Sequence, residues 1–131
     1  MLNGFTLDDH AGTLRSGESI ADAVEAAIAL RAEAILFNCS QAEAITNALE
    51  IAIPTANGRV QLGGYANRFV SAHTTTGEAN AHLSSLRDDL DPASYEEIVR
   101  SWISSGATIV GGCCGMTPEH IAVLAASSKN A

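Results

Sequence analysis

The stretch Ala34-Ile35-Leu36-Phe37-Asn38-Cys39 has a counterpart 74 residues later, Thr108-Ile109-Val110-Gly111-Gly112-Cys113. In each copy a short apolar run leads to a cysteine. A run that is apolar at successive positions is typical of a strand buried on both faces, as in parallel sheets. Both cysteines are therefore expected at the carboxyl end of a strand.

Amphipathic helices are predicted around these strands. The first begins after the N-cap Ser19, and the second is expected to stop at Pro54. A third opens at Asp91-Pro92 and ends at Gly106, and a fourth opens at Thr117-Pro118. The expected inner faces of the last three helices are Ile45, Leu49, Ala52 and Ile53; Tyr95, Ile98, Val99, Trp102 and Ile103; and Ile121, Leu124 and Ala125.

A further strand is predicted over residues 60–65, although Gly63-Gly64 weakens the pattern. Strand and helix then alternate, which indicates an α/β fold with a parallel sheet. Residues 68–90 are polar, and a connection of this length is usually a functional or a disordered loop.

The composition bounds the class of protein. A chain of 131 residues that is 47% hydrophobic is enough for one folded domain. The net charge is −8 and the sequence has no cluster of lysine and arginine. A nucleic-acid or anionic-membrane partner is therefore not expected, because both require a basic surface. No apolar run is long enough to cross a membrane, and the first residues do not resemble a signal peptide. We expect a soluble, cytoplasmic protein.

The three cysteines are Cys39, Cys113 and Cys114. An odd number with two neighbours does not suit a secreted disulfide framework. Cys39 and Cys113 follow alternate strands, and alternate strands of a barrel contribute side chains to the same interior layer. The glycines at 111, 112 and 115 permit a bend that would bring Cys114 to them. Three thiolates with one open position would suit a catalytic zinc site.

Two other interpretations of the cysteines remain open. One is three buried thiols without a metal, and the other is a redox switch formed by Cys113 and Cys114. None of the four histidines has a spacing that requires metal ligation. His120, the nearest in sequence, is expected on the solvated surface of the last helix.

The residues Gly111-Gly112-Cys113-Cys114-Gly115-Met116-Thr117-Pro118-Glu119-His120-Ile121 resemble the C-terminal signature of the homocysteine S-methyltransferase family. Asn38-Cys39-Ser40 is similar to its upstream Asn-Cys motif, and Tyr65-Ala66-Asn67 to its Tyr-Pro-Asn. Phe5-Thr6-Leu7 and residues 14–19 resemble the segment around its fifth strand. The resemblance covers nearly the whole chain.

The resemblance implies the C-terminal part of a (β/α)8 barrel, with three or four parallel strands and their helices. It implies that Cys39, Cys113 and Cys114 bind Zn2+, which would hold homocysteine as a thiolate for methylation to methionine. The methyl donor would be S-methylmethionine, S-adenosylmethionine or a betaine-like compound. Asn38 and Tyr65 are candidates for the substrate side of the site.

A complete barrel needs about 250 residues. Residues 1–131 are therefore expected to form a partial homocysteine-binding domain that lacks the N-terminal half of the barrel. Its open edges favour pairing with a second copy or with a separate N-terminal half. The alternative function is a non-enzymatic zinc-binding or thiol-bearing module that associates with other chains through an open sheet edge.

Overall fold

The computed structural model describes residues 2–70 and 86–129, in which four strands alternate with four helices. The four strands form one sheet in the order β1-β2-β3-β4, and all three neighbouring pairs are parallel. The elements are β1 (Leu2–Thr6), α1 (Ile20–Ala29), β2 (Ala34–Asn38), α2 (Ala42–Ala56), β3 (Gln61–Ala66), α3 (Pro92–Ser105), β4 (Ile109–Gly112) and α4 (Pro118–Lys129).

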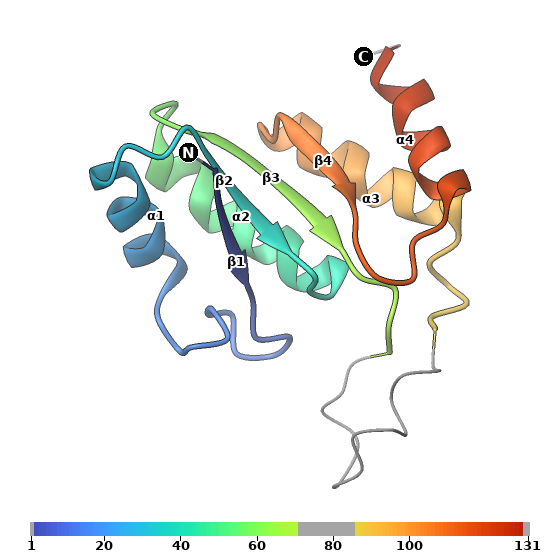
Figure 1. Cartoon of the computed structure of the whole chain (residues 1–131), viewed down its shortest axis with the longest axis horizontal. Helices are drawn as coiled ribbons and strands as arrows, with labels where there is room; N and C mark the ends of the chain where they lie inside the picture. The colour runs from blue at the N-terminus through green and yellow to red at the C-terminus, as the bar shows by residue number, and fades with distance from the viewer. Residues whose placement is uncertain (1, 71–85, 130–131) are drawn as a thin grey trace, which may run out of the picture.

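The helices cover one face of the sheet, and α2 and α3 lie behind the strands in Figure 1. The strand β2 shows the difference between the faces, because Ile35 and Phe37 are fully buried while Leu36 and Asn38 are only half-buried. A parallel sheet with its helices on one side is the arrangement of consecutive units of a (β/α)8 barrel. The predicted α/β fold with parallel strands is confirmed.

The predicted helix starts are confirmed by their hydrogen bonds. The Ser19 side chain accepts the Asp22 backbone N–H, and Asp91 accepts the Ser94 N–H in front of Pro92. Gly106, with φ 130°, ends α3 as expected. Among the described residues, no helix is both long and apolar enough to span a membrane.

The prediction that Pro54 stops the second helix is wrong. The helix α2 continues to Ala56, and Asn57 ends it in the left-handed conformation, with φ 48° and ψ 45°. Pro54 is exposed in the last turn, where it removes a single helical hydrogen bond. The buried Ala52 and Ala56 on either side keep the turn packed against the core.

The predicted inner face of the last helix is also wrong in part. Leu124 is buried, but Ile121 is 44% exposed and Ala125 is exposed as well. His120, expected on the surface, is 1% exposed. The helix α4 packs mainly against α3, so its buried stripe runs through positions 120 and 124 rather than 121 and 125.

The glycine pair Gly63-Gly64 does not interrupt β3. Neighbouring residues lie so close to both positions that a side chain would overlap them, so glycine is required there. A Cβ atom on Gly63 would lie 1.8 Å from the Ile109 carbonyl oxygen, and one on Gly64 would lie 2.6 Å from Ile45 Cγ2. Residues 71–85 of the predicted polar loop lie outside the described residues. At its described ends, Phe69 and Leu86 form an antiparallel bridge.

Candidate metal centre

The three cysteines meet at the carboxyl edge of the sheet. Cys39 follows β2, and Cys113 and Cys114 follow β4. The Cys114 Sγ lies 3.8 Å from Cys39 Sγ and 3.9 Å from Cys113 Sγ, and all three sulfurs lie within 4.8 Å of one another. A disulfide bond would need a separation of about 2.05 Å. Among the described residues, no further cysteine, histidine, aspartate or glutamate belongs to this group.

The strand between them positions two of the cysteines. The backbone N–H of Cys39 donates to the Tyr65 carbonyl at 3.0 Å, and that of Cys113 donates to the Ala66 carbonyl at 2.9 Å. These carbonyls belong to consecutive residues of β3, so Cys39 and Cys113 are attached to opposite edges of the same strand. Cys39 then turns the chain toward α2 in a left-handed conformation, with φ 46°.

A tight turn brings Cys114 to the other two. Gly111 and Gly112 remain in β4, and the turn is closed by the Met116 N–H donating to the Cys113 carbonyl at 3.1 Å. Gly115 takes a φ of 80°, and a Cβ atom there would lie 2.9 Å from Arg68 Cβ. Of the three glycines expected to allow the bend, Gly115 alone has a positive φ.

The three thiols of the cluster influence one another's ionisation. Burial works against ionisation of Cys39, but hydrogen bonds from Cys113, Cys114 and the Asn67 side chain lower the pKa of Cys39 below its usual value. Burial, together with the hydrogen bond to Cys39, raises the pKa of Cys113 to about 12. A divalent cation would offset the repulsion between neighbouring thiolates. Its binding would release the protons that the thiols still carry.

Burial of the cysteines bears on the alternatives. Cys39 and Cys113 are half-buried, and Cys114 is exposed. Three thiols whose purpose was packing would be covered by apolar side chains, which is not the case here. The arrangement is that of a solvent-accessible thiol cluster, able to bind a soft metal ion and a further ligand.

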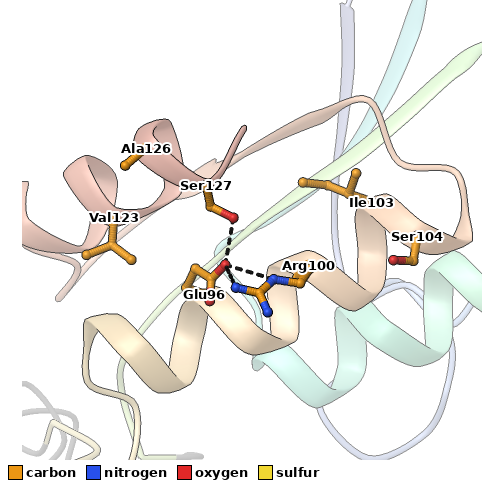
Figure 2. Close-up of a pocket in the computed structure, with 7 residues that line it drawn as sticks. All are labelled: Glu96, Arg100, Ile103, Ser104, Val123, Ala126 and Ser127. Atoms are coloured by element: carbon orange, nitrogen blue, oxygen red, sulfur yellow. Dashed lines mark hydrogen bonds and ion pairs between the residues drawn. The ribbon is translucent and has the colours of Figure 1, made fainter. Parts of the chain in front are cut away.

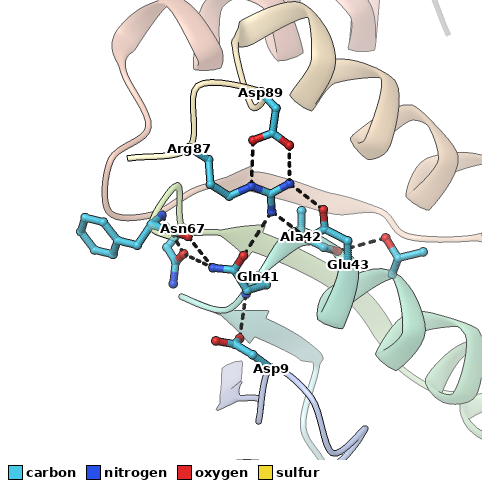
Figure 3. A network of polar contacts seen from close by, with 9 residues as sticks. Asp9, Gln41, Ala42, Glu43, Asn67, Arg87 and Asp89 are labelled. Carbon is cyan, nitrogen blue, oxygen red and sulfur yellow. Dashed lines mark hydrogen bonds and ion pairs between the residues drawn. The ribbon is translucent and has the colours of Figure 1, made fainter. Parts of the chain in front are cut away.

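A polar network lies at the start of α2, which follows Cys39 in the chain (Figure 3). The Gln41 side-chain amide donates to Asn67 Oδ1 at 3.3 Å and to the Phe69 carbonyl at 2.6 Å. Arg87 donates to Gln41 Oε1 at 3.1 Å and pairs with Glu43 and Asp89 at 2.7 and 2.8 Å. Asn67 is thereby held beside Cys39.

The structure places the two predicted substrate residues on the uncovered face of the sheet. Asn38 Oδ1 accepts a hydrogen bond from Thr6 Oγ1 at 3.1 Å. The Tyr65 hydroxyl lies 3.8 Å from the position that a Cβ atom on Gly4 would occupy. A residue two positions beyond Tyr65, Asn67, also acts on the cluster, because its side chain helps to lower the pKa of Cys39. In the sequence, the Tyr65-Ala66-Asn67 motif could have indicated Asn67. No sequence motif indicates Gln41 or Arg87.

A separate pocket lies between α3 and α4 (Figure 2). Its volume is about 560 Å³. Glu96 lies in it, and its carboxylate accepts hydrogen bonds from Arg100 Nε at 3.0 Å and from Ser127 Oγ at 2.6 Å. The pocket is lined by residues of α3 and α4 alone and includes none of the cysteines.

A one-sided parallel α/β sheet with a cluster of three thiols at its carboxyl edge is consistent with part of a (β/α)8 barrel and carries a candidate thiolate metal site. The family model described as homocysteine S-methyltransferase matches residues 1–128. The chain belongs to the homocysteine S-methyltransferase family.

One curated relative is the uncharacterized protein YMR321C of Saccharomyces cerevisiae. It is 44% identical over 36 residues, which are 28% of this chain and 34% of the yeast protein. The chain therefore matches about a third of the length of this relative.

Proposed function

We propose that this chain carries the metal site of a zinc-dependent homocysteine S-methyltransferase, with Cys39, Cys113 and Cys114 as the zinc ligands. The reaction would transfer a methyl group from S-methylmethionine, S-adenosylmethionine or a betaine-like donor to homocysteine, giving methionine. The observation that carries the proposal is the convergence of three sulfurs within 4.8 Å in a chain of this family.

The spacing of the sulfurs fits zinc. Tetrahedral zinc with Zn–S bonds of about 2.3 Å places neighbouring sulfurs about 3.8 Å apart. The separations of Cys114 Sγ from Cys39 Sγ and from Cys113 Sγ, 3.8 and 3.9 Å, agree with this value. Three protein ligands leave a fourth position for a substrate, as in catalytic rather than structural zinc sites.

Zinc, when bound, supplies the Lewis acidity that keeps a ligand thiol ionised at neutral pH. The three cysteines would hold the ion at the carboxyl edge, with its open position accessible from solvent. Homocysteine's sulfur would attack the donor's methyl carbon in line. The new S–CH3 bond forms as the donor's bond to that carbon breaks, and its electron pair leaves with the donor. The chain's part in the rate would be to orient the sulfur toward the methyl group.

Asn38 and Tyr65 would contribute to the substrate side of this site. Both lie at the end of their strands, on the uncovered face that corresponds to the inside of a barrel. The two residues are opposite each other in the register of β2 and β3, and Asn38 directly precedes Cys39, which supports this role. The Thr6–Asn38 hydrogen bond would fix the orientation of the amide.

We propose that residues 1–131 are a partial homocysteine-binding domain, equivalent to the C-terminal half of the barrel. Among the described residues, β1 pairs only with β2 and β4 only with β3, and one face of the sheet has no helices. Further strands would complete the barrel, supplied by an N-terminal half or by a second copy.

Metal analysis tests the zinc site. The purified chain is expected to bind about one zinc ion per molecule, and Cys39→Ser should abolish stoichiometric binding because two thiolates hold zinc far more weakly than three. Cys113→Ser and Cys114→Ser serve as matched variants and should lose zinc in the same way. Zinc retained by Cys39→Ser, with folding verified by circular dichroism, would rule out a shared site.

The second candidate is a non-enzymatic zinc-binding module that associates with other chains through its sheet edges. The observation in its favour is the single pairing of β1 and of β4 within the described ranges. A methyl-transfer assay with and without a supplied N-terminal half separates the two functions. Methionine formed when the two halves are combined supports the enzyme, and zinc binding without any turnover supports the module.

A further inference from the structure

The hydroxyl of Tyr95 lies between β3 and β4, where these two strands end. Tyr95 is in the first turn of α3 and is 0% exposed. Its oxygen accepts the Ala66 backbone N–H at 3.1 Å, and its O–H donates to the Gly111 carbonyl at 2.6 Å. Ala66 pairs with Gly112, and regular parallel pairing in this register would join the same two backbone groups directly. The phenol therefore takes part in the final residue pair of the β3–β4 ladder, Ala66 with Gly112.

The backbone beyond this pair carries two of the cysteines. The Cys113 N–H donates to the Ala66 carbonyl at 2.9 Å, and the Arg68 N–H donates to the Cys114 carbonyl at 2.8 Å. Cys39 is attached to the other edge of β3. The separation of β3 and β4 at the Tyr95 hydroxyl therefore influences how far Cys113 and Cys114 lie from Cys39.

The rest of the Tyr95 side chain is held by packing. Its ring contacts Trp102 edge to face, with centroids 5.9 Å apart, and His120 at 6.3 Å. Burial raises the pKa of Tyr95 to about 12, so the hydroxyl keeps its proton at neutral pH and can donate to Gly111. Phenylalanine would preserve the ring contacts and remove both hydrogen bonds.

We propose that Tyr95 is a positioning residue of the cysteine site, whose hydroxyl sets the separation of the β3 and β4 ends so that Cys113 and Cys114 reach Cys39. Tyr95 acts through the backbone and touches neither the metal nor the substrate. The inference rests on the proposed function, because it assigns to Tyr95 the geometry of the zinc ligands.

The test compares zinc affinity in the wild-type chain, Tyr95→Phe and Thr46→Val, by competition with a chromophoric chelator. The absorption spectrum of bound Co2+ reports the ligand geometry. Tyr95→Phe is expected to remain folded and to lower zinc affinity about 10- to 100-fold, the usual effect of removing a group that orients metal ligands. Thr46→Val removes a different hydrogen bond, to Trp102 Nε1 on α3 (2.8 Å), and should retain wild-type affinity and spectrum.

Equal zinc affinity in Tyr95→Phe and wild type would overturn the inference, and so would an equal loss in both variants. A Tyr95→Phe chain that does not fold would overturn it as well, since Tyr95 would then act on global stability. A wild-type chain that binds no zinc would overturn the proposed function instead.

Amide hydrogen exchange in the metal-free chain tests the role of Tyr95 even if the wild-type chain binds no zinc. Tyr95→Phe should accelerate exchange at the Cys113 amide, on the β4 side of β3, by at least several-fold relative to the Cys39 amide on the β2 side. Unchanged exchange at Cys113, or equal acceleration at both amides, would overturn the positioning role.

Discussion

At the scale of single residues, His120 shows how a polar side chain can be part of the core. Its Nδ1 accepts the Thr117 backbone N–H at 3.1 Å, and its Nε2 lies 2.9 Å from the Leu90 carbonyl. The imidazole therefore joins the start of α4 to the segment that precedes α3. A buried histidine with both nitrogens partnered is a structural element and not a metal ligand.

We expect His120→Ala to lower the free energy of unfolding by about 2 to 4 kcal/mol. The change leaves a cavity and deprives one buried and one part-buried backbone group of its partner. Urea unfolding measures the effect, with the exposed neighbour Glu119→Gln as the control, for which a change below about 0.5 kcal/mol is expected. An equally small effect of His120→Ala would contradict the structural role.

Cys39 is the other residue whose conformation matters. It is one of three described residues other than glycine with a positive φ, and the only one of them in the site. Such a conformation costs on the order of 1 kcal/mol or more and is often retained where function requires it. Here it directs the chain from β2 into α2 and leaves the sulfur facing Cys114.

At the scale of elements, the β3 glycines allow neighbouring elements to approach closely. Gly63 lies against the backbone of β4 at Ile109, and Gly64 lies between Ile45 of α2 and Trp102 of α3. Strand propensity alone disfavours two adjacent glycines in a strand. The tight packing around β3 accounts for their presence.

Gly63→Ala should be strongly destabilising, by about 3 kcal/mol or more, because the methyl group would overlap the β4 backbone, which cannot move without breaking the ladder. Gly4→Ala in β1 is the matched control: its nearest atoms would be 3.8 Å away or more, and we expect a change within about 0.5 kcal/mol. Thermal unfolding of the two variants compares them. Similar melting temperatures of Gly63→Ala and Gly4→Ala would show that the β4 backbone can shift to accommodate the methyl group.

Arg87 connects α2 to the segment before α3, and this contact depends on pH. Hydrogen bonds from Arg87 lower the pKa of Glu43 and that of Asp89 below their usual values. Carboxyl groups with a lowered folded-state pKa stabilise the protein above their usual range, near pH 4, and this stabilisation is lost as the pH falls through the lowered values.

We therefore expect Arg87→Gln to lower stability at neutral pH by about 0.5 to 1 kcal/mol, a modest value because Glu43 is largely exposed. The difference from wild type should shrink as the pH falls below about 4 and through the lowered pKa values, because the carboxylates are then progressively protonated. Urea unfolding across this range measures it. Arg59→Gln breaks the more exposed Arg59–Glu25 pair and should change stability less at every pH. A constant difference between Arg87→Gln and wild type would exclude the linkage.

At the scale of the whole molecule, the described residues form the cysteine site but do not enclose it. The uncovered face of the sheet includes Leu36, Asn38 and Tyr65, and within residues 2–70 and 86–129 each outer strand pairs along one edge only. A parallel sheet is stable when both faces are covered and its edges are paired or protected. Function at this scale depends on what covers that face.

We expect the isolated chain to bind zinc but to form methionine weakly or not at all, because half of the substrate enclosure would be missing. Addition of an N-terminal half of a family member should increase methionine formation by at least tenfold if it completes the barrel. Chromatographic detection of methionine, with Cys39→Ser as the inactive control, measures the outcome. Rapid turnover by the chain alone would contradict the proposal of a partial domain.

The sequence by itself determined the α/β class, the helix starts at Ser19 and Asp91, and the location of Cys39 and Cys113 at strand ends. These features depend on local signals: apolar runs, capping side chains and strand parity. The family membership also followed from contiguous residues, above all Gly111 to Ile121. Such information lies within a few residues along the chain.

Only the tertiary structure decided which side chains support the cluster and which are buried. The burial of His120, the continuation of α2 past Pro54 and the effect of Asn67 on the pKa of Cys39 depend on neighbours far away in the sequence. The Tyr95 hydroxyl reaches backbone groups 29 and 16 residues away. No local pattern encodes these contacts, because they arise from the packing of helices against strand ends.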